Sequence, residues 1–119
     1  MKAFAVNCTL KPGPDASSTD LLLDQIAAQL DDHGVSLDRV RIGDLDVKPG
    51  VSHDEGEGDG WPPVKRSIDE AELFVLATPI WMGHPSSHAQ RVLERLDAFI
   101  SETDERGQMP TADKVAMVA

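Results

Sequence analysis

The sequence is poor in cysteine, in basic residues and in long apolar runs, and each shortage excludes a class of protein. Its one cysteine, Cys8, allows no internal disulfide, which excludes a small secreted fold held together by disulfides. It carries 11 basic against 21 acidic side chains, a formal net charge of −10, so nucleic acids and anionic membrane surfaces are poor partners. No apolar run approaches the roughly 20 residues that span a bilayer.

These shortages predict a cytoplasmic protein with no membrane or nucleic-acid partner, since the start MKAFAV is also too short for the apolar region of a signal peptide. The length of 119 residues predicts one domain, residues 1–119, with its own core. The acidic excess suits a protein that works at high salt, where screening reduces the repulsion between carboxylates.

Short apolar runs alternate with stretches of helical periodicity along the chain. We predict strands at residues 3–6, 36–42, 73–77 and 114–119. The apolar faces of the predicted helices are Leu22, Leu23, Ile26 and Leu30, then Val64, Ile68 and Ala71, then Val92, Leu93, Leu96, Phe99 and Ile100. The acidic, glycine-rich segment 46–60 is predicted to be a mobile loop. This alternation predicts a parallel sheet with helices on both faces, where ligands bind beyond the carboxyl ends of the strands.

The loop after the first strand, NCTLKPGPDASST at residues 7–19, has side chains typical of a phosphate site. Hydroxyl groups, an ammonium group and the free N–H groups of the next helix form a cradle for an anion. The side chains concerned are Thr9, Lys11, Ser17, Ser18 and Thr19. The loop is neither GxGxxG nor GxxxxGKS/T, which argues against a dinucleotide or triphosphate site of the usual kind. A helix-capping cluster without a ligand explains the same residues.

The loop after the third strand, TPIWMGHPSS at residues 78–87, has an apolar and aromatic character. A flat heterocycle would lie against Pro79 and Trp81, while backbone N–H groups near Met82 and Gly83 reach its edge, because glycine lets the backbone approach a ligand closely. The alternative is a tight turn with Trp81 in the core.

Together the two loops resemble those of the NAD(P)H-dependent FMN reductases, a group within the flavodoxin-like superfamily, and the resemblance covers essentially the whole chain. It implies a flavodoxin-like three-layer α/β/α fold with a parallel sheet in the order 2-1-3-4. It also implies that the FMN phosphate is held by Thr9, Lys11, Ser17, Ser18 and Thr19. The same resemblance implies that the flavin ring is contacted by Pro79, Ile80, Trp81, Met82 and Gly83. Lys11 stands where many members of the group have an arginine.

The function that the resemblance implies is an FMN-dependent oxidoreductase. Hydride would pass from NAD(P)H through the flavin to a flavin, quinone or similar acceptor, in a homodimer, with no catalytic side chain from the protein. A flavodoxin-type electron carrier without its own activity and a flavin-free scaffold domain remain alternatives. A receiver domain of two-component signalling does not fit, because Asn7, Cys8 and Thr78 stand where it requires acidic residues.

Three further features are better explained by structural roles or by chance spacing than by a role in a site. Cys8 is predicted to be a small apolar core residue rather than a thiol beside a flavin. His84 and His88 have the spacing of metal ligands, but with no third ligand nearby we predict no metal site. Trp61 is expected to pack under the acidic loop, or alternatively to fold over a flavin in a partner subunit.

The end of the sequence carries a further expectation. Ala119 lies inside an apolar run, so we expect a truncated domain without its fifth strand, which binds FMN poorly and aggregates.

Overall fold

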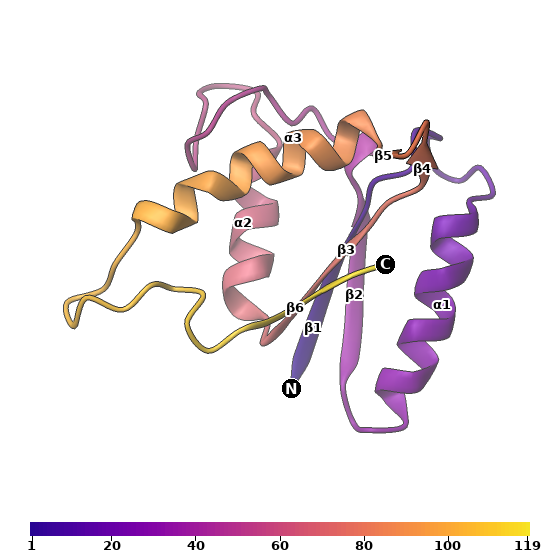
Figure 1. Cartoon of the computed structure of the whole chain (residues 1–119), viewed down its shortest axis with the longest axis horizontal. Helices are drawn as coiled ribbons and strands as arrows, with labels where there is room; N and C mark the ends of the chain where they lie inside the picture. Colours follow the sequence, from indigo (N-terminus) through magenta and orange to yellow (C-terminus); the bar gives the residue numbers. More distant parts are fainter.

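The structure, a computed structural model, describes residues 1–119, whose main sheet has four parallel strands with helices on both faces (Figure 1). The strands of the main sheet are β1 (Lys2–Asn7), β2 (Ser36–Arg41), β3 (Leu73–Ala77) and β6 (Val115–Val118). The α-helices are α1 (Ser18–Asp31), α2 (Trp61–Glu70) and α3 (Ser87–Leu96), and the short 3-10 helices are η1 (Ile42–Asp44) and η2 (Asp97–Ser101). A small hairpin is formed by β4 (Ile80–Trp81) and β5 (His84–Pro85).

The strand order β2-β1-β3-β6 confirms the predicted order 2-1-3-4, because β4 and β5 belong to the separate hairpin. Every pair in the main sheet is parallel. The register sets Asn7, at the end of β1, opposite both Arg41 of β2 and Ala77 of β3. The three strands therefore end level with one another, and the segments that follow them leave from the same edge of the sheet.

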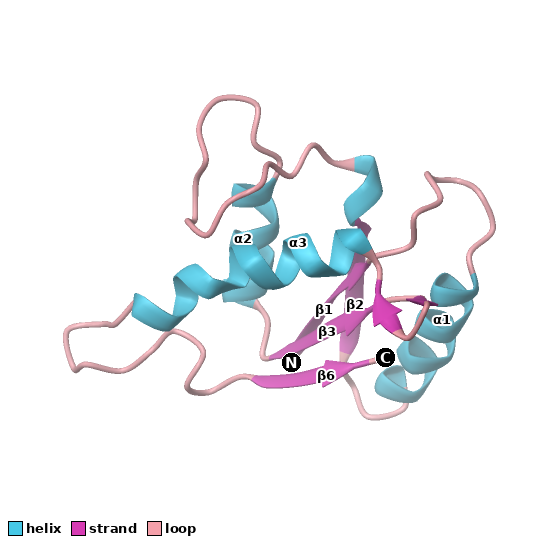
Figure 2. Ribbon diagram, turned by 45° about the horizontal axis from the view of Figure 1, so that its top comes forward, coloured by secondary structure: helices cyan, strands magenta, loops and turns pink.

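Alternate residues of β1 point to opposite faces of the sheet and enter different cores. Phe4 and Val6, together with Cys8 just after the strand, join the larger core cluster, which is shared with α2 and α3. Ala5 joins a smaller cluster with Leu23 of α1. Figure 2 shows α1 apart from α2 and α3, which agrees with this division. The result is the predicted three-layer α/β/α arrangement.

The helices begin where the sequence offers caps. Ser17 caps α1, because its side chain accepts a hydrogen bond from the Asp20 N–H, and Ser86 caps α3 in the same way toward Ala89. Prolines in the first turn start α2, where the missing N–H costs nothing. None of the helices has the length and apolar character that a membrane crossing requires.

The last helix differs from the prediction in where it ends and what it buries. The α-helix stops at Leu96, and η2 continues the chain. Val92 and Phe99 are buried as predicted, but Leu93 and Ile100 are exposed. These two side chains line an apolar groove of about 520 Å³ beside β6, which we call the α3–β6 groove. The helical spacing predicts the correct face, but Leu93 and Ile100 stay uncovered where the chain packs along β6.

The acidic segment 46–60 forms no strand and no α-helix, yet it is anchored to the core. Asp59 makes a two-pronged ion pair with Arg95 of α3, with N···O distances of 2.9 and 2.6 Å, and both side chains are fully buried. Arg95 also donates to the carbonyls of Lys48 and Ser52. The composition of the segment predicts a mobile loop and does not reveal this anchor, because the two residues of the ion pair lie 36 positions apart in the sequence.

Candidate functional site

The loops after β1 and β3 are joined at the edge of the sheet where the strands end. The Cys8 N–H donates to the Ala77 carbonyl at 2.8 Å, and the Ser86 hydroxyl donates to the Cys8 carbonyl at 2.6 Å. The Ser86 N–H donates in turn to the Thr78 hydroxyl at 3.0 Å. Figure 1 shows the hairpin β4–β5 next to the start of the loop after β1. The two loops that the sequence singled out therefore form one continuous surface.

The five predicted phosphate residues lie together in the first loop and the first turn of α1, but they differ in exposure. Lys11 and Ser18 are exposed, whereas Thr9, Ser17 and Thr19 are buried. Thr9 accepts the Lys11 N–H and Ser17 accepts the Asp20 N–H, and each hydroxyl keeps its own proton to donate. The Lys11 ammonium donates to the Ala16 carbonyl at 3.2 Å. Capping and ligand binding are thus compatible here.

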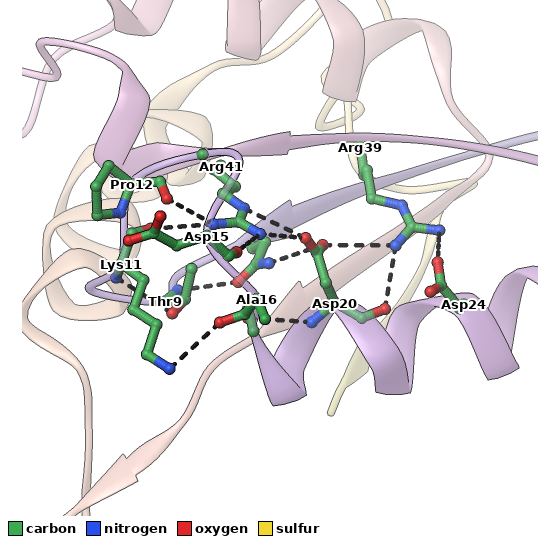
Figure 3. Close-up of polar contacts among 12 residues, drawn as sticks. Thr9, Lys11, Pro12, Asp15, Ala16, Asp20, Asp24, Arg39 and Arg41 are labelled. Atoms are coloured by element: carbon green, nitrogen blue, oxygen red, sulfur yellow. Dashed lines mark hydrogen bonds and ion pairs between the residues drawn. The ribbon is translucent and has the colours of Figure 1, made fainter.

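Arg41, which lies outside both sequence motifs, is at the centre of the contacts of this loop (Figure 3). Its guanidinium donates to the carbonyls of Lys11, Pro12 and Asp15. The same group donates to the Asp20 carboxylate, at 3.2 Å from Nε and 2.6 Å from Nη2. The signal was available, because β2 was predicted beside β1 and Arg41 is a basic residue at its end.

Asp20 concentrates the polar contacts at the start of α1. Burial alone would raise its pKa, but hydrogen bonds from Arg41 and Asn7 and the charges of Arg41 and Arg39 outweigh burial and hold the pKa below its ordinary value. Arg39 reaches the same carboxylate at 3.5 Å and pairs with Asp24 at 2.9 Å. A negative charge in the first turn of the helix is therefore balanced by two arginines from β2.

The second loop is a hairpin whose apolar side chains face the solvent. Ile80, Trp81 and Met82 are 75%, 59% and 99% exposed. Met82 and Gly83 have φ values of 52° and 78°, as in the two-residue turns that connect tight hairpins. Because Trp81 lies outside the core, the alternative of a turn with a buried Trp81 is wrong.

The predicted ring residues therefore form a surface with little to cover it. Pro79 is half-buried and Gly83 is exposed. A Cβ added to Gly83 would meet no atom within 4 Å, so the backbone is open to a ligand there. Apolar side chains exposed beside a hydroxyl-rich loop fit a molecule that has a flat ring at one end and a phosphate at the other. The residues present therefore fit FMN.

The α3–β6 groove does not fit this ligand. It lies along α3, η2 and β6, and its lining is mostly apolar. Its one basic residue, Lys114, already donates to the carbonyls of Asp69 and Ala71. The other charged side chain of the lining is the Asp97 carboxylate, which would repel a phosphate.

The remaining candidates take structural positions. Cys8 is fully buried, and burial raises the pKa of its thiol to about 12. Trp61 is also fully buried with the Arg95 guanidinium 5.5 Å from its ring, so the alternative in which it covers a flavin in a partner subunit is wrong. No group of three or more His, Cys, Asp or Glu side chains that could hold a metal occurs.

Comparison with known proteins identifies a family and several relatives. A family described as NADPH-dependent FMN reductase matches residues 1–119. The chain is 31% identical over 125 residues to the 8-demethyl-8-aminoriboflavin-5′-phosphate synthase of Streptomyces davaonensis, which covers 98% of this chain and 49% of the synthase. It is 39% identical over 112 residues to the divalent metal cation transporter MntH of Mycobacterium bovis, covering 91% of this chain and 16% of the transporter.

Solved structures agree with the family match. The crystal structure of RosB with a bound 8-demethyl-8-formylriboflavin-5′-phosphate intermediate superposes with a TM-score of 0.87 at 30% identity, over 99% of this chain and 50% of RosB. A putative quinone reductase from Klebsiella pneumoniae superposes with a TM-score of 0.62 at 15% identity, over 99% of this chain and 57% of the reductase, and supports the fold alone. The chain thus spans about half the length of the synthase and of RosB.

Proposed function

The chain belongs to the NADPH-dependent FMN reductase family, and from this premise we propose that it binds FMN across its two loops. In the proposed reaction, electrons pass from NAD(P)H through the flavin to a small acceptor such as a flavin or quinone. FMN supplies the ring that accepts and releases hydride. The proposed reaction needs no acid or base from the protein.

The observation that carries the proposal is the exposed apolar hairpin tip next to a hydroxyl-rich helix start. Lys11, Ser18 and the first N–H groups of α1 would hold the phosphate, where the helix dipole favours a negative charge. Ile80, Trp81 and Met82 would pack against the ring and lose contact with water. The hydrogen bond between Ser86 and Cys8 would keep these two halves of the site in register.

A matched pair of isoleucines tests whether the hairpin holds the ring. Ile80 in the hairpin and Ile100 in the α3–β6 groove are 75% and 67% exposed. Ile80→Ala should weaken FMN binding by about 1 kcal/mol, a partial loss of the burial energy of an isoleucine, and Ile100→Ala should leave it unchanged. Flavin fluorescence during titration measures both. A larger effect of Ile100→Ala would refute the assignment.

Redox activity separates this proposal from an electron carrier without activity. The chain would be mixed with FMN, freed of unbound flavin, and treated with NADH or NADPH while the visible flavin absorption is recorded. Bleaching that recovers on addition of a quinone is expected. A coloured protein that neither nicotinamide bleaches would support the carrier, and a colourless one would support a flavin-free scaffold.

A second candidate function is chemical modification of a bound flavin phosphate. It is favoured by the match to the synthase and to RosB, whose TM-score of 0.87 exceeds the 0.62 for the quinone reductase. Mass spectrometry of FMN recovered after incubation distinguishes the two functions, because a redox cofactor returns with its mass unchanged. The first proposal, that of an FMN-dependent oxidoreductase, also includes a homodimer, a nicotinamide and a small-molecule acceptor as partners, and a cytoplasmic location.

A further inference from the structure

We propose that Arg41 is a positioning residue that shapes the first loop for the phosphate group of a flavin phosphate without touching the phosphate itself. The inference rests on the proposed function, which places the phosphate at this loop. It concerns a residue of β2, outside both of the loops that the sequence singled out.

The hydrogen bonds of Arg41 account for every donor that its side chain has. A guanidinium carries five N–H groups. Nε donates to Asp20, Nη1 donates to the carbonyls of Lys11 and Pro12 at 3.3 and 3.0 Å, and Nη2 donates to Asp20 and to the Asp15 carbonyl at 2.6 Å. The side chain is only 12% exposed. No donor remains for a ligand, so Arg41 acts on the loop rather than on the phosphate.

Three carbonyl groups of the loop turn toward this one cation. They come from residues 11, 12 and 15, so the backbone folds around the guanidinium as shown in Figure 3. The Gly13 N–H is held separately by the Asp44 carboxylate at 2.9 Å. Hydrogen bonds with a charged partner are stronger than neutral ones. The loop conformation therefore depends on these charged contacts in addition to the hydrogen bonds within the loop.

Arg41 also removes an electrostatic obstacle to a phosphate. Asp20 lies in the first turn of α1, close to where a phosphate would bind, and an unbalanced carboxylate there would repel a dianion. The contact of 2.6 Å with Arg41 pairs that charge. A lysine would supply the charge but not the five-donor fork that reaches three carbonyls as well.

Arg39 is a matched control on the same strand. It also contacts Asp20, and it pairs with Asp24, but it donates to no carbonyl of residues 8–16. The experiment compares the unaltered chain with Arg41→Gln, Arg41→Lys and Arg39→Gln. Each is titrated with FMN and with riboflavin, which differs from FMN in lacking the phosphate. Amide hydrogen exchange of residues 9–19 is measured without ligand.

The expected result is a loss of affinity for FMN, which has the phosphate, and not for riboflavin, which lacks it. Arg41→Gln and Arg41→Lys should both bind FMN about tenfold more weakly, the scale of one hydrogen bond with a charged group, with little change for riboflavin. Exchange of residues 9–19 should be faster in both. Arg39→Gln should keep the preference for FMN over riboflavin and the slow exchange. Because both ligands are measured on one sample, a general loss of folding would lower both affinities together.

Three results would overturn the inference. One is full FMN affinity in Arg41→Lys, which would mean that charge alone suffices. Another is an unchanged preference for FMN in both Arg41 variants, and the third is equal exchange of residues 9–19 in all four proteins. If the unaltered chain bound neither flavin, the proposed function itself would fail. If the unaltered chain and both Arg41 variants preferred FMN equally, only the inference about Arg41 would fail.

Discussion

Gly83 and Gly34 both have backbone conformations that favour glycine, yet only Gly83 belongs to the proposed ring site. Their φ values are 78° and 74°, and an added Cβ at either one meets no atom within 4 Å. Replacing either with valine should cost about 1–2 kcal/mol of stability through the left-handed backbone. Gly83→Val should in addition obstruct flavin and lower its affinity, whereas Gly34→Val should not. Equal FMN affinities in the two variants, measured by titration, would argue against the site.

Two neighbouring serines separate ligand binding from helix capping. Ser18 is exposed at the first residue of α1, and Ser17 is the buried cap. Ser18→Ala should weaken FMN binding by no more than about 1–2 kcal/mol, the effect of one lost hydrogen bond, at an unchanged melting temperature. Ser17→Ala should lower stability by about 1 kcal/mol. Unchanged FMN affinity in Ser18→Ala would remove this residue from the site.

At the scale of elements, the ion pair between Asp59 and Arg95 fixes the segment 46–60 against α3 and makes stability depend on pH. The hydrogen bonds from Arg95 hold the pKa of Asp59 well below its usual range. A carboxyl whose native pKa is depressed stabilises the fold above its unfolded pKa, about 3.9, and this contribution is lost as pH falls below that value toward the native pKa. Stability should therefore decline below about pH 4.

Asp59→Asn tests this anchor, because it leaves a buried guanidinium without its counter-charge. The loss at pH 7 should be about 3–5 kcal/mol, and stability should fall less steeply in acid than in the unaltered chain. Glu57→Gln, an exposed change in the same segment, serves as the control. Denaturant unfolding at pH 7 and at pH 3 supplies the comparison. Parallel pH profiles for Asp59→Asn and the unaltered chain would show that the pair does not govern acid stability.

The elements differ in how well the sequence predicts them. The sequence predicts the strand at residues 73–77 with its observed limits, because a continuous apolar run between polar segments marks a buried parallel strand. The sequence indicates only a turn where the hairpin β4–β5 lies, since strands of two residues leave no periodicity to detect. Arg41 and Arg95 find their acidic partners 21 and 36 residues away, so their contacts appear only once the sheet and helices are assembled.

At the scale of the whole molecule, β6 forms an edge of the sheet with exposed apolar side chains. Val118 is 73% exposed, and the α3–β6 groove runs beside it. Unpaired apolar edges promote association between chains, so we expect residues 1–119 to self-associate. Val118→Lys should reduce association in light scattering, while Val51→Lys, at an exposed position within segment 46–60, should not. A monodisperse monomer in the unaltered chain would contradict this expectation.

The central claim is that FMN binds at the two loops beyond the carboxyl ends of β1 and β3, and chemical-shift mapping tests it most directly. Amide spectra of the isotope-labelled chain would be recorded as FMN is added. We predict that the largest shifts fall in residues 9–19 and 79–83, with little change in β6 and η2. Shifts concentrated in the α3–β6 groove, or no shifts at saturating FMN, would contradict the account.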